Sequence, residues 1–543
     1  MILDYNPATR MFVLRVNRRE AVVQDIMREH GLDFSVPAST PQEAVLFTAE
    51  PYAAVAFHRH ATPAARGMLS GLITEIEASW APDYGGNFAC PPDQELWGFQ
   101  KASLAYALRR DNSIIGDQPG LGKTNTAICF ANEVKAKRCL AIVPASLRGQ
   151  WADRIRRWTT LPWPYTVHTI GNARHGVHPT AAWTVVSYEL ARTPTIAKAL
   201  ARGLYDVLVL DEAHFLKTPS SRRSRAVFGG GADHGIPALA SRAGAILALT
   251  GTPLPNRPRE AFVLARGLNH DCIDWMSEDA FYERFNPRLV TQVPDIATGR
   301  MKTFVDERSG RHAELQARLR ANIMVRHLKR EVMPQLKLPE YDIIQAEETG
   351  PVRQALEAES LLDIDPNDLA GADAAILGHI SVVRKQMGLA LAPQVADYVE
   401  MCLDGGEEKV VVFAWHIEVL DILQERLRKH GVVRVDGSTS MTTKDARVRQ
   451  FQDDPRIRVI LGNLLSLGTG TDGLQRVASR AVIAEPDWVP GTNIQAIDRL
   501  DRGGQTRQVQ ADIVVAPNSF AERILASALR KNHVIHGSLD RTF

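Results

Sequence analysis

Cysteine is scarce in this sequence, and the cysteines that occur are scattered. There are five among 543 residues, at Cys90, Cys129, Cys139, Cys272 and Cys402, and none forms a CxxC pair. An odd number of widely separated cysteines excludes a disulfide framework and a zinc ribbon as the organising feature of the fold. We therefore expect a reducing, cytoplasmic setting.

The sequence also lacks long apolar runs and an excess of one charge. No stretch approaches the roughly 18 apolar residues that a membrane helix needs, and the opening MILDYNPATR lacks the layout of a signal peptide. We therefore expect no membrane partner. The 64 Lys and Arg residues nearly balance 62 Asp and Glu residues, which leaves a net charge of +2. Nucleic acid would thus have to bind a local basic surface.

Short β-branched runs alternate with helical stretches from about Ser113 onward. Strands this apolar are buried on both faces, as in a parallel sheet. The sequence therefore predicts an α/β protein with two tandem parallel sheets. Their strands are SIIGD (113–117), CLAIVP (139–144), TVVSY (184–188), VLVLDE (207–212) and ILALTGT (246–252), then KVVVFAWH (409–416), VVRVDG (432–437), RVILGN (458–463), AVIAE (481–485) and ADIVVAP (511–517).

The length corresponds to about three or four domain-sized units. Residues 1–90 mix strand and helix signals and end in a loop-like stretch, which predicts a small N-terminal α+β domain. A charged, largely helical region at about 257–335, with apolar positions at helical spacing in 315–332, predicts a helical protrusion between the two sheets. We set the boundaries at 1–90, 91–345 and 346–543.

The first predicted strand leads into DQPGLGKT at 117–124. This is the layout of a P-loop, with Asp117 in place of the usual first glycine. Backbone N–H groups around Gly120 and Gly122 would wrap phosphates, Lys123 would reach the β and γ phosphates, and Thr124 would hold Mg²⁺. The sequence therefore predicts an ATP site.

A second buried strand ends in DEAH at 211–214. Asp211 can bind the magnesium ion, and Glu212 can orient and deprotonate the attacking water. His214 is expected to link this site to the neighbouring strand end at 250–252. Together with the P-loop, the motif predicts nucleotide hydrolysis.

Near the C-terminus, QAIDRLDRGGQ at 495–505 places Gln495, Asp498, Arg499 and Arg502 at the spacing of one helix face. A polar face is usually solvated. Two arginines in register on a face without an apolar stripe would, however, suit a γ-phosphate between the two α/β units, where an arginine finger accelerates hydrolysis about a thousand-fold or more.

The ordered motifs resemble those of the Swi/Snf-type ATPases of superfamily II, over roughly residues 95 to 530. RKQMGLALAP (384–393), VVVFAWHIEVLD (410–421) and EPDWVPG (485–491) look most similar to the HARP-type annealing helicases and their bacterial and phage relatives. The motifs that carry the family resemblance are GLGKT, PASLRGQW (144–151), VVSYEL (185–190), DEAHFLKT (211–218), LTGTPLPN (249–256), DGST (436–439), GTGTDGLQ (468–475) and QAIDRLDRGGQ.

This resemblance implies two RecA-like lobes and ATP-driven translocation on double-stranded DNA. Gln100 would read adenine, and the ATP-site residues carry over with the roles given above. The segments around Ser146, Ser187, Ser438 and Thr469 would follow DNA phosphates without reading sequence. The basic run SSRRSR (220–225), with Arg222 and Arg223, is either a solvated loop or a further DNA contact.

We therefore expect a DNA-stimulated ATPase that uses ATP and Mg²⁺, acts on double-stranded or forked DNA, and anneals or remodels forks. Alternatives are a motor that displaces protein from DNA, a nucleotide-gated clamp without productive turnover, and an RNA helicase, which GTPLPN and RGGQ disfavour. Residues 1–90 could sense forks or only buttress the first lobe. A single copy would suffice for this scheme, and any protein partner is open.

Overall fold

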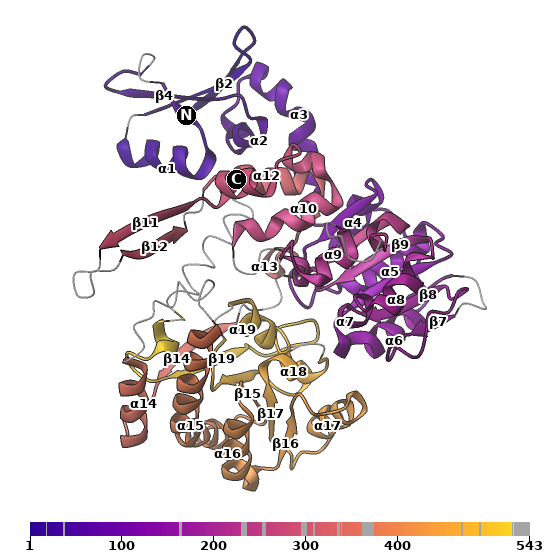
Figure 1. Cartoon of the computed structure of the whole chain (residues 1–543), viewed down its shortest axis with the longest axis vertical. Helices are drawn as coiled ribbons and strands as arrows, with labels where there is room; N and C mark the ends of the chain where they lie inside the picture. The colour runs from indigo at the N-terminus through magenta and orange to yellow at the C-terminus, as the bar shows by residue number, and fades with distance from the viewer. Residues whose placement is uncertain are drawn as a thin grey trace. The chain divides into compact units, whose positions relative to one another are not determined.

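The computed structural model describes residues 1–17, 19–35, 39–161, 166–229, 236–251, 253, 257–294, 301–307, 310–333, 337, 339–360, 374–468, 471–487, 490–523 and 525. Contacts group these residues mainly into two compact units. The first is built from Met1–Gln118 and Gly122–Leu328, and the second from Lys329–Asn532. Each unit contains a parallel sheet covered by helices (Figure 1).

The first unit begins with a four-stranded antiparallel sheet in the order β1-β2-β4-β3. Alternate residues of β2 (Phe12, Leu14, Val16) are buried in a core of their own, as expected for a sheet with one covered face. The sequence had predicted an α+β arrangement here. Its elements are β1 (Ile2–Asn6), β2 (Met11–Asn17), α1 (Glu20–His30), β3 (Asp33–Phe34), β4 (Glu43–Thr48), α2 (Pro51–Ala54) and α3 (Pro63–Ala78).

A seven-stranded parallel sheet follows, in the order β13-β5-β10-β9-β6-β8-β7. Every strand predicted in this half is present within one to three residues, whereas β7 and β13 were not predicted. The elements are α4 (Gly98–Leu108), β5 (Asn112–Ile115), α5 (Lys123–Glu133), β6 (Cys139–Val143), α6 (Arg148–Trp158), β7 (Val167–Thr169), β8 (Trp183–Ser187), α7 (Tyr188–Ala191), α8 (Pro194–Ala201), β9 (Tyr205–Asp211), α9 (Arg222–Phe228) and β10 (Ala243–Leu249).

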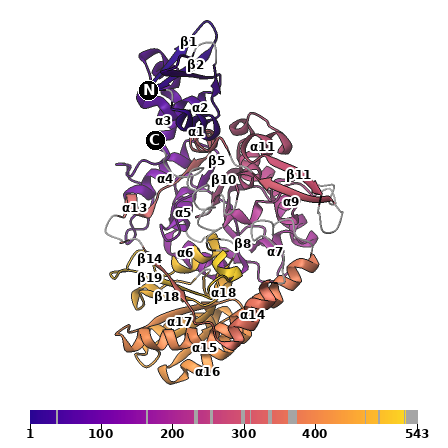
Figure 2. The ribbon, with the colours of Figure 1, turned by 90° about the vertical axis from the view of Figure 1, so that its left-hand side faces the viewer.

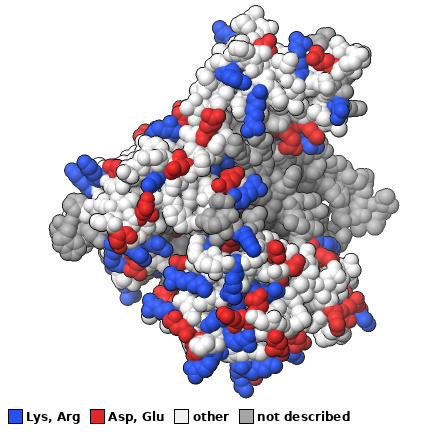
Figure 3. Space-filling view, turned by 180° about the vertical axis from the view of Figure 1, so that it is seen from behind, with Lys and Arg blue, Asp and Glu red and all other residues white. Residues whose placement is uncertain are grey.

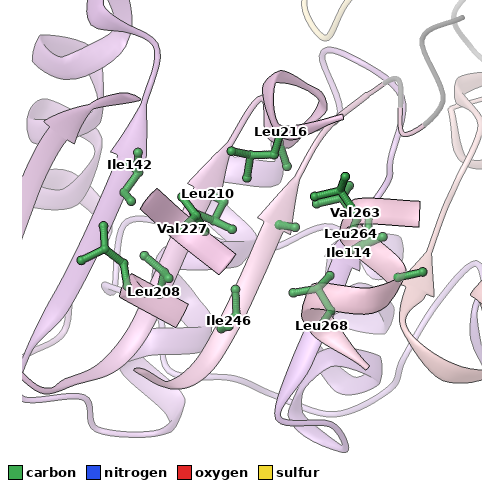
Figure 4. Packing of buried hydrophobic residues seen from close by; sticks show 14 of the residues in the cluster. Ile114, Ile142, Leu208, Leu210, Leu216, Val227, Ile246, Val263, Leu264 and Leu268 are labelled. Atoms are coloured by element: carbon green, nitrogen blue, oxygen red, sulfur yellow. The ribbon is translucent and has the colours of Figure 1, made fainter. Parts of the chain in front are cut away.

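The two faces of this sheet carry separate hydrophobic clusters. On β9, Leu208 and Leu210 belong to one cluster, while Val207 and Val209 belong to the other, because successive side chains of a strand point to opposite faces. Figure 4 shows the first cluster, where β-strand side chains meet Leu264 and its neighbours on α10. The sheet is therefore buried on both sides, as its apolar sequence predicted.

The region predicted as a helical protrusion is largely helical and also contains strands. β11 and β12 form an antiparallel hairpin, and β13 adds to the edge of the parallel sheet beside β5. Helix α12 lies against α1, α2 and α3 of the N-terminal layer (Figure 1). The elements are α10 (Phe262–Leu268), α11 (Glu278–Phe285), β11 (Arg288–Pro294), β12 (Met301–Glu307), α12 (His312–Asn322), β13 (Met324–Val325) and α13 (Lys329–Val332).

Helix α12 is buried along its whole length although its sequence, HAELQARLRAN, is rich in charge. Arg318 is fully buried and pairs with Glu50 of the N-terminal layer at 2.5 Å, with Asp274 at 2.7 Å and with Glu314 at 2.9 Å. Burying this guanidinium is tolerable only because several carboxylates surround it. The N-terminal layer is thus fixed to the rest of the first unit through α12.

The second unit is built on a six-stranded parallel sheet in the order β14-β19-β18-β15-β17-β16. Helices α14 to α16 cover one face and α17 to α19 the other (Figure 2). The elements are β14 (Glu340–Gln345), α14 (Gly350–Ser360), α15 (Ala374–Asp404), β15 (Val410–Ala414), α16 (Ile417–Leu427), β16 (Val432–Val435), α17 (Met441–Asp453), β17 (Val459–Asn463), α18 (Leu464–Gly468), β18 (Arg480–Ile483), α19 (Pro490–Ile497) and β19 (Gln510–Val515).

All five strands predicted for this second sheet are present, and β14 is an addition. The strand β14 ends at the predicted boundary of 345 and pairs with β19. The boundaries at 90 and 345 stay predictions. Among the described residues, no helix has the length and apolar run needed to cross a bilayer.

Candidate nucleotide and nucleic-acid sites

The P-loop connects the end of β5 to the start of α5. Gly120 and Gly122 have φ angles of +86° and +77°, a left-handed conformation that glycine adopts without steric cost. The Lys123 ammonium donates to the backbone oxygens of Asp117 at 2.8 Å and of Gln118 at 3.3 Å. The lysine is therefore held against the glycine loop by its backbone oxygens, and phosphate binding by this loop stays a prediction.

Asp117 anchors the beginning of this loop. Its Oδ1 accepts a hydrogen bond from the backbone N–H of His327 at 2.9 Å and lies 2.8 Å from His327 Nδ1, and Ser103 Oγ donates to Oδ2 at 3.0 Å. Burial favours a raised pKa, but the pull of His327, Lys123 and Ser103 outweighs it and holds the pKa of Asp117 below its usual value. Asp117 is therefore an ionised structural anchor.

Gln100 lies beside the P-loop, as its predicted part in nucleotide binding requires. Its Oε1 accepts from the backbone N–H of Trp97 at 2.9 Å and so caps α4. A Cβ atom at Gly122 would collide with Gln100 Nε2. The side chain is thus held against the glycine loop, and adenine recognition by Gln100 stays a prediction.

Asp211 ends β9, where its carboxylate is buried and fully engaged. Trp151 Nε1 donates to Oδ2 at 2.7 Å, and the backbone N–H of Glu212 donates to Oδ1 at 3.0 Å. Burial, followed by the negative charge of Glu212, raises the pKa of Asp211 to about 6 despite the nearby Lys123. Sequence reasoning did not assign Trp151 a function, and no local pattern marks an indole as the partner of a distant carboxylate.

Glu212 has a φ of +49°, which is uncommon for a residue with a side chain. Its Oε2 lies 3.3 Å from His214 Nδ1, and the same nitrogen lies 3.1 Å from Thr250 Oγ1 at the end of β10. The predicted link between DEAH and the neighbouring strand end is therefore confirmed. Of that strand end, Thr252 lies outside the described residues.

The donor set fits a magnesium ion. Thr124 and Asp211 supply the hydroxyl and carboxylate oxygens that Mg²⁺ accepts, and the adjacent negative charges of Asp211 and Glu212 would be relieved by a cation. The described residues contain no group of three or more His, Cys, Asp or Glu side chains placed to hold a metal. Phosphate and water oxygens would therefore have to complete the coordination.

The arginine segment of the second unit differs from its prediction. Helix α19 ends at Ile497, so Asp498, Arg499 and Arg502 lie in the turns that follow instead of on one regular helix face. The segment also has an apolar side, because Ile497 and Leu500 pack in the core of the second unit.

Both arginines of this segment are held by the protein. Arg499 Nε donates to the backbone oxygen of Gln495 at 3.2 Å, and Arg502 Nε donates to that of Asp498 at 3.1 Å. Arg502 also pairs with Asp472 at 3.1 Å. Arg499 is only 9% exposed. Their guanidinium groups are therefore oriented before any ligand binds, and their predicted action on a γ-phosphate stays a prediction.

The predicted backbone contacts with DNA differ in their surroundings. Ser146 is half-buried in a short 3₁₀ turn, and Ser187 is buried with its Oγ capping α7 through the N–H of Leu190. Ser438 is exposed, and its Oγ donates to Asp436 Oδ1 at 2.6 Å. Thr469 lies outside the described residues.

Arg222 and Arg223 begin α9 and are not equivalent. Arg222 is exposed, whereas Arg223 pairs with Glu189 at 2.9 Å and lies over the ring of Phe215. On the face seen in Figure 3, Lys and Arg residues are interspersed with Asp and Glu residues. Of the pair, Arg222 is the better placed for an incoming phosphate.

Comparison with known proteins identifies both α/β units. Residues 99–347 match the family model described as "SNF2-related domain", and residues 394–504 match "Helicase conserved C-terminal domain". The chain is 32% identical over 457 residues to "DNA annealing helicase and endonuclease ZRANB3" of Bos taurus, which covers 82% of this chain and 40% of that protein. The human protein of that name is 30% identical over 458 residues, with the same coverage.

A second group of relatives carries the name "SWI/SNF-related matrix-associated actin-dependent regulator of chromatin subfamily A-like protein 1". The Xenopus tropicalis member is 29% identical over 437 residues, which is 78% of this chain and 42% of that protein. The chain thus spans about two fifths of the length of the curated relatives it matches. A solved structure described as "Sulfolobus solfataricus SWI2/SNF2 ATPase core in complex with dsDNA" matches 82% of this chain and 94% of that chain, with 19% identity and a TM-score of 0.38.

Proposed function

Because this chain belongs to the SNF2-related family of helicase-like ATPases, we propose that it is an ATP-driven motor that translocates along double-stranded DNA. One observation carries the proposal: β5, β10 and β9 are neighbouring parallel strands, so the P-loop, Thr250 and the DEAH carboxylates follow them at one edge of the sheet, where His214 contacts Thr250. This edge of an open parallel sheet is where α/β proteins bind their ligands. The three motifs are far apart in sequence, and their convergence supports hydrolysis over a chance glycine turn.

The proposed hydrolysis gives each predicted site residue a role. Lys123 and the amides around Gly120 and Gly122 bind the phosphates, while Thr124 and Asp211 would hold Mg²⁺, which would neutralise phosphate charge. Glu212 orients the attacking water and takes its proton. Arg499 and Arg502 stabilise the charge that develops on the γ-phosphate.

The DNA contacts are proposed along the phosphate backbone. A hollow of about 660 Å³ in the second unit is lined by Ser438, Thr439, Ser440 and Arg447, among others. Hydroxyl groups and an arginine suit phosphate oxygens and carry no sequence information. Together with Ser146 and Arg222 of the first unit, these groups support duplex binding without base readout, whereas Ser187 is buried with its Oγ capping α7.

We further propose that forked DNA is the preferred substrate. The ZRANB3 relatives are named as DNA annealing helicases, and reannealing at a fork is an action that a duplex translocase can perform without separating strands. The N-terminal layer, fixed to the first unit through α12, would present a rigid surface to the fork.

Steady-state ATP hydrolysis tests the proposal. It is measured without nucleic acid and then with linear duplex, forked duplex, single-stranded DNA and RNA, all at one salt concentration. We expect the forked duplex to stimulate most and RNA least. Equal stimulation by linear duplex would favour a general translocase that displaces proteins, the absence of stimulation would favour a clamp, and stimulation by RNA alone would contradict the proposal.

A further inference from the structure

The four residues Arg326–Lys329, called the connector below, join the first unit to the second. The connector begins immediately after β13. Arg326, His327 and Lys329 are at most 4% exposed. Three polar side chains buried within four residues must each have partners, and these partners belong to the proposed ATP site.

The first half of the connector holds the P-loop. Arg326 donates to the backbone oxygen of Gly116 at 2.6 Å and to that of Gly251 at 3.1 Å. His327 contacts Asp117 through both its backbone N–H and its ring nitrogen. The end of β5, the start of the P-loop and the loop after β10 are thereby fixed to two consecutive residues.

The second half of the connector holds the arginine segment. The Lys329 ammonium lies 2.5 Å from Asp498 Oδ1 and 2.8 Å from Asp501 Oδ2, and it also contacts the backbone oxygen of Asp501. These two aspartates alternate in sequence with Arg499 and Arg502. Burial raises the pKa of Asp501, and the nearby Lys329 opposes that rise.

Each set of contacts lies within one unit. His327 and Asp117 belong to the first unit, while Lys329, Asp498 and Asp501 belong to the second. The contacts therefore hold for any placement of the two units. Because only Leu328 separates His327 from Lys329, their Cα atoms cannot be more than about 7 Å apart.

We propose that the connector positions both sets of residues assigned to ATP hydrolysis, with His327 setting the P-loop and Lys329 setting the arginine segment. This inference rests on the proposed function, since it assigns the arginines to the γ-phosphate. It makes His327 and Lys329 positioning residues that do not themselves touch the nucleotide.

The test separates the two ends of the connector by what each should change. Lys329→Met leaves two buried carboxylates without their cation, so the arginine segment should shift and kcat should fall by about 10²-fold. ADP lacks the γ-phosphate, so its Kd should stay unchanged. His327→Gln removes the ring nitrogen that contacts Asp117 at the start of the P-loop and should raise the Kd for ADP by about ten-fold.

A matched control is Lys409→Met. Lys409 is also buried in the second unit, where it donates to the backbone oxygens of Phe451 and Asp454, which are not part of the arginine segment. Lys409→Met should destabilise the second unit. Its kcat per folded molecule should equal that of the wild type. Should Lys329→Met fail to fold, Asp501→Asn provides the same test with a smaller change, because it removes one of the two partners.

Coupling is measured in the background of Arg499→Ala with Arg502→Ala. If Lys329 acts through the arginines, adding Lys329→Met should lower kcat no further. The inference would be overturned if Lys329→Met lowered kcat by the same factor in this background as in the wild type. It would also be overturned if Lys409→Met lowered kcat as much as Lys329→Met, or if kcat and ADP affinity changed in parallel in each connector variant. Failure of the proposed function is visible separately, because the arginine variants alone would then hydrolyse ATP normally.

Discussion

The two parallel sheets differ at the helix that follows their first predicted strand. In the first sheet, β5 leads through the glycine loop to α5, whose N-terminus has Gly122 as its cap and no side-chain cap. In the second unit, β15 leads directly to α16, and Glu485 accepts the N–H groups of Trp415 and His416 at 2.8 and 2.9 Å. Helix N-termini attract anions, and the second unit supplies that anion from its own chain.

The difference teaches how one chain can contain two α/β units and a single proposed nucleotide site. Glu485 is 6% exposed, and its Oε1 lies 2.7 Å from His416 Nδ1. A carboxylate held this way fills the place where a phosphate could bind. In the proposed ATP hydrolysis, the second unit therefore contributes the arginines, and the first contributes the loop that binds phosphate.

The strongest way to break this comparison is to disable the first unit. Lys123→Ala should prevent ATP hydrolysis, because the phosphates lose their cation. Glu212→Gln should lower kcat by about 10²–10⁴-fold while sparing ATP binding, because only proton removal from water is lost. Hydrolysis rates and ATP affinity measured on both variants check this, and normal turnover in either would refute the site.

Gly122→Ala sharpens the comparison at the glycine loop. The added Cβ would collide with Gln100, and the alanine would have to adopt a φ near +77°. ADP affinity should therefore fall by about ten-fold or more. Gly176→Ala is the matched control, since Gly176 has a φ of +64° and open space around it. Similar ADP affinities in the two variants would show that the loop geometry is not needed.

Glu485→Gln tests the second unit in this comparison, at the start of α16. The N–H groups at the start of α16 would keep an acceptor but lose its charge, so the second unit should be destabilised by about 1–3 kcal/mol. Nucleotide affinity should not change. Chemical denaturation and ADP titration measure the two effects, and a new nucleotide site in the second unit of this variant would be the most informative exception.

A substitution of His30 changes how stability depends on pH, and this change identifies which unfolding transition belongs to the first unit. Burial lowers the pKa of His30 to about 4, and the ring lies 4.7 Å from that of Phe57. Between pH 8 and pH 5 the unfolded chain gains a proton that the folded chain does not, so stability is lost as pH falls, by about 1–2 kcal/mol at pH 5. His30→Phe should remove this loss.

The readout is denaturation of both proteins at pH 8 and pH 5. At pH 5 the first unit of His30→Phe should be more stable than that of the wild type. At pH 8 this difference in stability should be smaller. The second-unit transition, which Glu485→Gln moves, should be the same in wild type and His30→Phe. If the stability difference between His30→Phe and the wild type did not change with pH, His30 would not be buried as a neutral ring.

Local sequence predicted much of the fold and the centre of the site, for physical reasons. Strands buried on both faces have unmistakably apolar sequences, and glycines with positive φ stand at fixed spacing before Lys123. The partners of these motifs were not predictable. The contacts of Asp117 with His327 and of Asp211 with Trp151 join residues with no shared pattern.

Tertiary packing alters two charged segments in ways that the sequence pattern does not show. The sequence predicts that the two arginines lie on one helix face, whereas α19 ends at Ile497 and Leu500 of the following turn packs in the core of the second unit. Helix α12 carries arginines and glutamates that suggest an exposed surface, yet it is buried all round. Ion pairs formed across the fold decide such cases, and a single sequence does not record them.

The burial of α12 has a consequence for how the chain is made. The N-terminal layer is synthesised before α12, but Ala317 of α12 completes its core and Arg318 is the partner of its Glu50. Since α3 ends at Ala78 and α12 begins only at His312, the layer must wait roughly 10–50 s for its missing helix at ordinary rates of synthesis. During that interval its uncovered face is a natural client surface for chaperones.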